Sequence, residues 1–368
     1  MTIMITKFRH WWLLLALPLQ AATVPEGFTL TTVADNVPNA RQMAWGQDGT
    51  LFVGSRKEGK VYALKDLDNN GEFETRYLIA EALFMPSGLA VKGADLYVAA
   101  VNRILRFPNI DKHLASPKME VAFDGLPSDA HHGWKFIRFA PDGRLIVPVG
   151  APCNICDESS PYASILSLDL AKGQYQVIAR GVRNSVGFDF HPQTGELYFS
   201  DNGRDMMGDD VPADEINRLS QHGAHYGYPY RHGKAVNDPD HVLPKALQGK
   251  LTEPLFELQA HVAPLGVHFY RGTQFPEAYR GALFIAEHGS WNRSKKVGYQ
   301  VTALNVDTQP PQYRQVVTGW LDGERPLARP VAFVETSDGS LLISDDYNGA
   351  IYKLSYTAPV QPEKDNNE

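Results

Sequence analysis

Short apolar runs that alternate with polar residues recur along the chain, and each follows a glycine turn. Each run starts with a Leu that lies two or three positions after the Gly. The six copies occupy residues 48–53, 93–98, 142–147, 195–199, 281–285 and 338–343. Alternation with a period of two between glycine turns is typical of β-hairpins. Each copy therefore predicts one strand of a repeated antiparallel unit.

A second run of β-type residues follows every copy, at residues 61–64, 104–107, 165–168, 216–219, 301–304 and 351–354. The Leu residues that start the first runs lie 45, 49, 52, 86 and 58 residues apart. A four-stranded propeller blade takes about 40–50 residues. The pattern therefore predicts an all-β fold, a six-bladed β-propeller of four-stranded blades. A β-sandwich built from repeated hairpins is the alternative.

The same spacing predicts the domain organisation. Residues 23–357 form a single propeller domain, and residues 358–368 form a flexible tail. The interval of 86 residues exceeds one blade, and residues 202–262, which are rich in Asp, Gly, His and Tyr, fill most of it. Long insertions on a rigid scaffold usually carry function. We therefore expect part of the functional site in this insertion.

The first 22 residues have the layout of a secretory signal peptide. Lys7 and Arg9 precede a short apolar run at residues 11–17, and the small residues Ala21 and Ala22 follow. This run is shorter than the roughly 20 residues that span a bilayer. The sequence therefore predicts an exported, periplasmic protein without stable membrane insertion, and an N-terminal membrane anchor is the alternative.

Composition and charge narrow the classes of function. The chain has 368 residues, is 43% hydrophobic and carries a formal net charge of −7. That hydrophobic fraction supports a packed core, and the acidic balance argues against nucleic-acid binding. No Gly-x-Gly-x-x-Gly motif follows a predicted strand, so a nicotinamide or flavin enzyme is unsupported. Cys153 and Cys156 are the only cysteines, and we expect a local disulfide, with a redox-active dithiol as the alternative.

Two of four polar clusters next to the repeats favour proton transfer and anion binding. His131 and His132 precede the third copy, and neutral imidazole is a suitable general base. The alternative is a pair of partly buried loop histidines. Arg183 and Asn184 precede the fourth copy and suit a ligand with carboxylate or carbonyl oxygens. A salt bridge between blades is the alternative for that pair.

The other two clusters favour a cation and an aromatic ligand. Residues 201–215 are rich in Asp and Gly, and oxygen-rich loops of this kind suit calcium. A solvated acidic loop is the alternative. Trp291 and Arg293 follow the fifth copy and combine a stacking surface with a cation. Because all four clusters lie beside strands of the repeat, we expect them at one end of the central channel.

At these clusters the chain resembles the soluble glucose/sorbosone dehydrogenases, which use pyrroloquinoline quinone (PQQ) on a six-bladed propeller. The resemblance extends over residues 131–157, 180–229, 287–299 and 329–352. The pieces 133–135, 151–154 and 289–293 are most similar to the sorbosone dehydrogenase branch. The glucose dehydrogenase branch differs near Met85 and at Leu327, which leaves the substrate and the clamp on the cofactor carboxylates open.

The resemblance implies a role for each matched residue. His132 corresponds to the catalytic base. The carbonyls of Gly203 and Arg204 correspond to ligands of an active-site Ca²⁺, and Glu215 and Tyr226 to a structural Ca²⁺ site. The positions that correspond to PQQ contacts or complete that pocket are Arg41, Arg183, Asn184, His288, Trp291, Arg293 and Arg329.

The expected activity is therefore a PQQ- and calcium-dependent dehydrogenation. His132 takes the proton of an anomeric hydroxyl while a hydride passes to the quinone. The substrate is an aldose or a related aldehyde such as sorbosone, and an external acceptor takes the electrons. A calcium-dependent propeller lactonase and a non-catalytic binding propeller are the alternatives.

Overall fold

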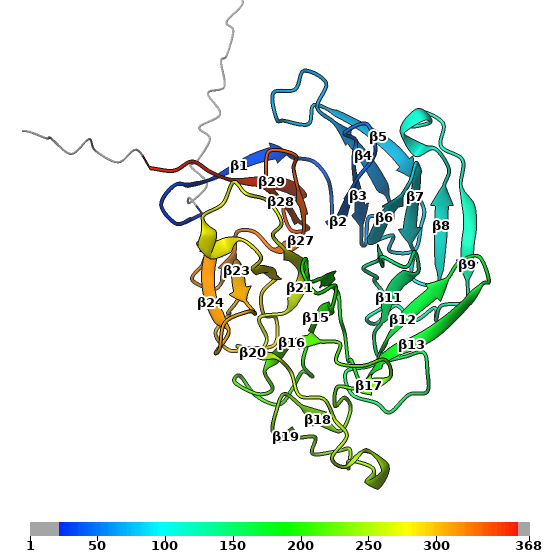
Figure 1. Ribbon diagram of the computed structural model, residues 1–368, viewed down its shortest axis with the longest axis vertical. Helices are drawn as coiled ribbons and strands as arrows, with labels where there is room; N and C mark the ends of the chain where they lie inside the picture. Colours follow the sequence, from blue (N-terminus) through cyan, green and yellow to red (C-terminus); the bar gives the residue numbers. More distant parts are fainter. Residues whose placement is uncertain (1–21, 360–368) are drawn as a thin grey trace, which may run out of the picture.

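The computed structural model describes residues 22–359, so all but the last residue of the predicted signal peptide and most of the predicted tail lie outside the described residues. Six β-sheets are arranged around a central axis in the described part of the chain (Figure 1). Each sheet has at least four antiparallel strands, as expected for a propeller blade. The predicted six-bladed β-propeller is thus confirmed, and a sandwich is excluded.

The innermost strands surround the axis, and five of the six neighbouring pairs are in close contact. They are β2 (Ala40–Trp45), β6 (Gly88–Lys92), β10 (Arg138–Phe139), β14 (Phe188–Phe190), β21 (Pro264–Phe269) and β27 (Pro330–Glu335). The second strands are β3 (Leu51–Ser55), β7 (Asp95–Ala99), β11 (Leu145–Val149), β15 (Leu197–Asp201), β22 (Leu283–Glu287) and β28 (Leu341–Asp345). These second strands contain the Leu runs of the sequence repeat.

The third strands contain the second run of each repeat, except for Leu219, which directly follows β16. They are β4 (Val61–Lys65), β8 (Arg103–Phe107), β12 (Ser164–Asp169), β16 (Asp214–Arg218), β23 (Gln300–Asn305) and β29 (Ala350–Tyr356). The repeat also explains the register, because Leu51 pairs with Leu64 in the first blade and Leu341 pairs with Leu354 in the last.

The outermost strands vary most between the blades. They are β5 (Thr75–Ala80), β9 (Glu120–Asp124), β13 (Gln174–Arg180), β20 (Phe256–Leu258), β24 (Gln312–Val317) and β1 (Phe28–Ala34). The N-terminal β1 pairs with β29 and so completes the last blade. This pairing joins the two ends of the domain and closes the ring, as Figure 1 shows for the blue and red strands.

The core is divided into clusters between neighbouring blades. In β3, Leu51 and Val53 pack in the cluster shared with the last blade, whereas Phe52 packs in the cluster shared with the second blade. Successive side chains of a strand point to opposite faces, so both faces of each blade are buried. This explains why the second strands are almost continuously apolar.

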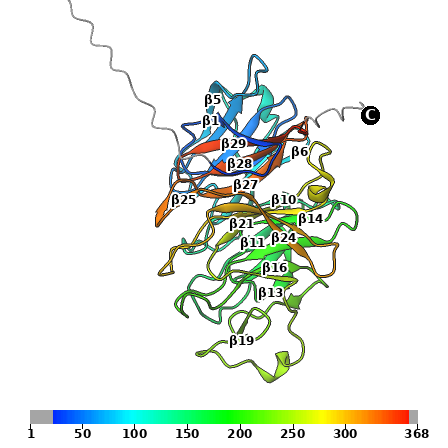
Figure 2. The same cartoon turned by 90° about the vertical axis from the view of Figure 1, so that its left-hand side faces the viewer.

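Three segments add to the blades. β17 (Ala224–His225) pairs in parallel with β13, and β25 (Leu321–Asp322) forms a hairpin with β26 (Arg325–Pro326). The hairpin of β18 (Arg231–His232) and β19 (Val236–Asn237) projects from one end of the molecule in both views (Figures 1 and 2). In residues 22–359 no helix is long and apolar enough to span a bilayer.

Candidate active site

A cavity of about 560 Å³ lies at one mouth of the central channel. Loops at the ends of the inner and second strands line it. Eight of the residues predicted for the site line the cavity: Arg41, His132, Arg183, Asn184, Gly203, His288, Trp291 and Arg329. Residues from β2 to the last blade, far apart in sequence, are thus brought to one cavity.

Glycines allow the inner strands to approach closely below this cavity. A Cβ atom on Gly187 would lie 2.2 Å from the carbonyl oxygen of Leu265, and one on Gly266 would lie 2.5 Å from that of Val331. Val186, Leu265 and Val331 form a small apolar cluster with Ala332 at this level. The cavity therefore has an apolar floor beneath a polar wall.

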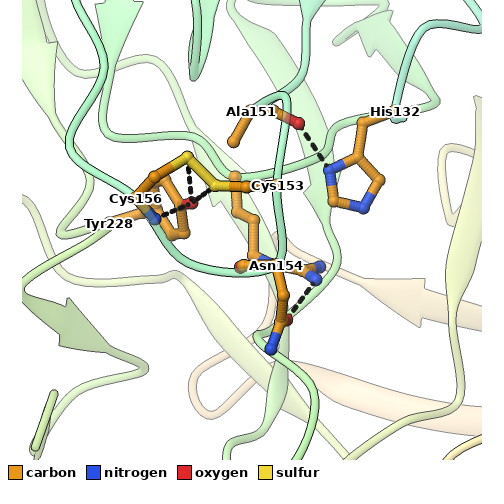
Figure 3. Close-up of a disulfide and its surroundings, with 7 residues drawn as sticks. His132, Ala151, Cys153, Asn154, Cys156 and Tyr228 are labelled. Atoms are coloured by element: carbon orange, nitrogen blue, oxygen red, sulfur yellow. Dashed lines mark hydrogen bonds between the residues drawn. A yellow bond between two sulfur atoms is a disulfide. The ribbon is translucent and has the colours of Figure 1, made fainter. Parts of the chain in front are cut away.

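His132 is buried at the cavity wall with the left-handed φ of 47°. Its Nδ1 lies 2.9 Å from the carbonyl oxygen of Ala151, as Figure 3 shows. Because a carbonyl oxygen only accepts, Nδ1 carries the proton, and the lone pair of the neutral ring is on Nε2. Burial, with smaller contributions from Arg183 and His131, lowers the pKa of His132 well below 6.5. The ring is therefore held as a neutral base.

Arg41 and His288 share one carboxylate. Arg41 Nη1 donates to Asp346 at 2.9 Å, and His288 Nε2 lies 2.8 Å from the other oxygen of the same side chain. Burial lowers the pKa of His288 to about 4, although Asp346 acts in the opposite direction. Arg41 thus has a compensating charge, and its guanidinium is fixed in place.

Arg329 is held by backbone carbonyls. Its Nε donates to His288 at 3.0 Å and its Nη2 to Gly289 at 2.7 Å, and its guanidinium lies 5.3 Å from the ring centre of Tyr299. Among the described residues no carboxylate lies within salt-bridge distance of Arg329. Its charge is therefore available to an anionic ligand.

Arg56 provides a second uncompensated cation at the cavity wall. Its guanidinium lies 3.8 Å from the ring centre of Trp134, and burial lowers its pKa to about 10. Arg56 Nε and Trp134 Nε1 are buried donors without a hydrogen-bond partner in the part of the chain that the structure describes. Buried donors of this kind are rare in folded proteins. The cavity wall therefore carries two unpaired cations, Arg56 and Arg329, and two of its residues have buried donors without an acceptor.

Arg183 and Asn184 are placed by the end of β15. Asp201 accepts hydrogen bonds from both of their backbone amides, at 2.9 and 2.7 Å. Asp214 similarly accepts from the Gly203 amide at 2.8 Å, and burial raises the pKa of Asp214 to about 7. Buried carboxylates at strand ends thus fix the loops that line the cavity.

Glu215 and Tyr226 line a separate small cavity of about 10 Å³ together with Asp201. Burial raises the pKa of Glu215 to about 7, and burial together with the charge of Glu215 raises the pKa of Asp201 well above its usual range. A space of this size is about that of one water molecule or ion. Arg183, Arg231 and His232 line the same space, and the two buried carboxylates are its acidic groups.

Two predicted residues do not point their side chains at the main cavity. The Arg293 guanidinium contacts the Asp209 carbonyl and donates to Asp210 at 2.8 Å, so it fastens two rim loops together. The Arg204 guanidinium contacts Asp238 and donates to Asp240 at 3.1 Å. The prediction for Arg204 concerns its backbone carbonyl, which this pairing leaves untested.

The sequence reasoning missed Arg56 and Asp346, it named Asp205 only as part of the acidic cluster of residues 201–215, and it gave Trp134 no role. A signal for two of them was present in the repeat. In four of the blades, the residue directly after the second strand is polar and lines or supports the cavity. These residues are Arg56, Asn202, His288 and Asp346. Reading this one position through all the repeats would have selected Arg56 and Asp346.

The fold and the cavity define a class: six-bladed propellers with an arginine-lined pocket at one mouth of the channel. The family described as a domain of unknown function, DUF7133, matches residues 16–367. An uncharacterized protein of Borreliella burgdorferi is 36% identical over 350 residues, which cover 90% of each chain. The chain therefore belongs to the DUF7133 family.

Three solved structures share the fold. The calcium structure of a family AA12 carbohydrate-active enzyme from Trichoderma reesei is 20% identical, covers 93% of this chain and 99% of its own, and has a TM-score of 0.77. The holo PQQ domain of pyranose dehydrogenase from Coprinopsis cinerea is 19% identical over 92% and 98% of the chains, with a TM-score of 0.75. The PQQ-bound aldose sugar dehydrogenase from Streptomyces coelicolor is 17% identical over 90% and 99%, with a TM-score of 0.63.

Proposed function

We propose that this protein is a PQQ- and calcium-dependent dehydrogenase that oxidises the anomeric hydroxyl of an aldose or a related aldehyde. The observation that carries the proposal is the neutral base His132 in a cavity whose wall presents the unpaired cations Arg56 and Arg329. Solved structures with this fold are described as PQQ-bound or holo sugar dehydrogenases, which supports the same cofactor here. An external acceptor takes the electrons in this proposal.

The residues of the cavity fit PQQ, which carries several carboxylates on an aromatic quinone. Arg56 and Arg329 have no carboxylate partner in the described chain, and the buried donors Arg56 Nε and Trp134 Nε1 have no acceptor. Carboxylate oxygens would satisfy these donors and balance both charges. Trp291, which is 65% exposed, would cover the aromatic rings at the rim.

Oxygen donors for calcium lie at both cavities and, outside them, at Asp66, Asp68 and Glu74. Gly203, Asp205 and Asp214 line the main cavity, and Asp201 and Glu215 line the small one. Hard divalent cations prefer such oxygen ligands. A bound Ca²⁺ would balance the buried carboxylates of Asp201 and Glu215 and so relieve the cost of burying them.

When bound, PQQ supplies a quinone that accepts a hydride. His132 accepts the hydroxyl proton of the substrate at Nε2, and the Ala151 carbonyl keeps the ring in that tautomer. Asp346 keeps Arg41 and His288 in place, and the apolar floor at Leu265 limits water below the ligand. The protein thus orients the reactants and holds one proton.

We further propose that the protein acts in the periplasm, within the sorbosone dehydrogenase branch of this class. The pattern of residues 1–22 supports export, and so does the disulfide between Cys153 and Cys156, since such bonds persist in oxidising compartments. Export is tested by N-terminal sequencing of the protein recovered from the periplasmic fraction. An intact residue 1 in that fraction, or recovery in the cytoplasm alone, contradicts this part of the proposal.

The activity is tested by reconstitution of the purified protein with PQQ and Ca²⁺. Reduction of an artificial dye is measured over a panel of aldoses and aldehydes, with each component omitted in turn. We expect turnover only when PQQ and Ca²⁺ are both present. Lactone hydrolysis with Ca²⁺ alone would support the lactonase instead. Absence of PQQ binding by calorimetry would exclude the dehydrogenase.

A further inference from the structure

The disulfide loop of residues 153–156 lies beside the cavity, and the proposed chemistry does not use it. Figure 3 shows this loop next to Ala151, the residue that accepts from His132. Within the described chain no backbone-to-backbone hydrogen bond involves residues 153–156. The covalent bond and side-chain contacts therefore determine the conformation of the loop.

Asn154 connects this loop to two residues of the cavity wall. Its backbone oxygen accepts from Arg183 Nε and its Oδ1 from Arg183 Nη2, both at 2.8 Å. The same Oδ1 accepts from the Asp205 amide at 2.8 Å, and Asn154 Nδ2 donates to the Asp205 carbonyl at 3.0 Å. Asn154 thus holds the loop, Arg183 and Asp205 together.

Arg183 is almost fully engaged in these contacts. It also donates from Nη1 to Asn202 at 3.1 Å and from Nη2 to Asp205 at 3.0 Å. A guanidinium has five N–H donors. Since the bonds to Asn154, Asn202 and Asp205 occupy four of them, only one donor on Nη1 is free for a ligand. The direction of that donor depends on the groups that hold the other four.

Tyr228 holds the opposite side of the loop. Its hydroxyl accepts from the Cys156 amide at 3.0 Å and lies 3.5 Å from Cys153 Sγ. Tyr228 is buried, whereas both cysteines are only half-buried. The loop is therefore fixed between Tyr228 and Arg183, and its two cysteines are partly exposed to solvent.

We propose that Asn154 is a positioning residue: the disulfide loop holds Arg183 and Asp205 at the cavity wall, and opening the disulfide releases them and weakens binding of an anionic ligand. The ligand is PQQ, so this part rests on the proposed function. A dithiol reductant transfers two electrons and two protons, which convert the disulfide to two thiols while the reductant becomes a disulfide.

The positioning role is tested first without ligand, by hydrogen exchange and mass spectrometry. The Asp205 amide donates to Asn154 and is the direct reporter. We expect its exchange to accelerate at least about tenfold after reduction and to return to the original rate after reoxidation. Asn154→Ala should show the same acceleration in the oxidised protein, and the exposed Asn70→Ala should not. Unchanged exchange in both reduced protein and Asn154→Ala overturns the proposal.

The second readout is the dissociation constant of PQQ, measured by calorimetry. We expect reduction or Asn154→Ala to raise it about tenfold or more, and Asn70→Ala to leave it unchanged. Equal affinity in all forms overturns the effect on the ligand. If oxidised wild-type protein binds no PQQ, the proposed function fails, and the exchange comparison still decides whether Asn154 positions Arg183 and Asp205.

Discussion

The proton on His132 Nδ1 is fixed by a single contact with the Ala151 carbonyl, which leaves Nε2 as the base. We expect His132→Ala to lower kcat/KM for the sugar by about 10²–10⁴-fold, since this is the usual contribution of a general base. PQQ affinity and melting temperature should change little. The measurement is steady-state dye reduction of the reconstituted enzyme. The exposed His113→Ala is the matched control, and equal rates in all three proteins would rule out this base.

Arg56 is the residue that tests the charge of the cavity. It stacks on Trp134 and has an unpartnered buried Nε, so an anion would gain a strong hydrogen bond there. We expect Arg56→Ala to raise the dissociation constant of PQQ by about 10- to 100-fold, measured by calorimetry. Arg76→Ala, on the exposed outer strand of the same blade, should leave the affinity unchanged. A similar loss in both variants would point to a non-specific charge effect.

At the scale of the elements, carboxylates at the ends of the second strands position residues of the cavity. Asp201 at the end of β15 and Asp345 at the end of β28 each accept a hydrogen bond from the backbone amide of a cavity arginine, Arg183 or Arg329. The same structural position in two blades therefore supports the same type of residue. Because this position recurs at the same end of each blade, polar groups from different blades gather at one mouth of the channel.

The pair of β15 and β16 provides the prediction on metal binding. Asp201 and Glu215 face each other across these strands, and burial raises both of their pKa values. We expect a chelator to lower the melting temperature of the wild-type protein by several degrees, since a bound cation stabilises the folded state. Glu215→Gln should remove most of this difference, and the exposed Glu253→Gln should preserve it. A melting temperature that is insensitive to chelation would contradict a structural cation.

At the scale of the whole molecule, a second charged network joins the inner strands of neighbouring blades away from the cavity. Buried Asp189 lies 2.9 Å from Arg138, 2.8 Å from Arg271 and 3.4 Å from His268, so it joins residues from three blades. Burial favours the protonated form of Asp189, but attraction to Arg138, His268 and Arg271 outweighs it and lowers the pKa to about 2.

The pH dependence of stability follows from this shift. Because the pKa is about 2 in the folded protein and 3.8 in the reference state, the contribution is present above pH 3.8 and is lost as the pH falls through 2. It amounts to about 2 kcal/mol. We expect Asp189→Asn to unfold at a lower urea concentration than the wild type near pH 5. The difference between the two midpoint concentrations should become smaller towards pH 2. The exposed Asp142→Asn should follow the wild type throughout. A difference in midpoint concentration that stays constant with pH would contradict a lowered pKa of Asp189.

Much of the fold was predictable because its signals are local. The Gly turn, the Leu run and the alternation with a period of two act over a few residues, and they correctly marked the second and third strands of every blade. The place of β1 as the outermost strand of the last blade was not predictable in this way. Its pairing with β29 spans almost the whole chain, and nothing within residues 28–34 specifies that partner.

The candidate site shows the same division. Arg183, Asn184 and His288 stand in conspicuous polar motifs, and the structure brings them to one cavity. Arg56 stands in an ordinary-looking turn, and Arg293 stands in a conspicuous motif but bonds to Asp210 at the rim. A motif identifies a polar residue. Whether its side chain points into the cavity depends on which loop from another blade lies opposite.

The sequence by itself determined the blade, the number of repeats and the pair of cysteines, since turns, alternation and a separation of three residues are short-range properties. Only the tertiary structure decided how the ring closes and which cations remain unpaired at its mouth. Those outcomes depend on side chains such as Asp346 and Asp205 that arrive from other blades. The charge available to a ligand is therefore a property of the closed ring and of no single motif.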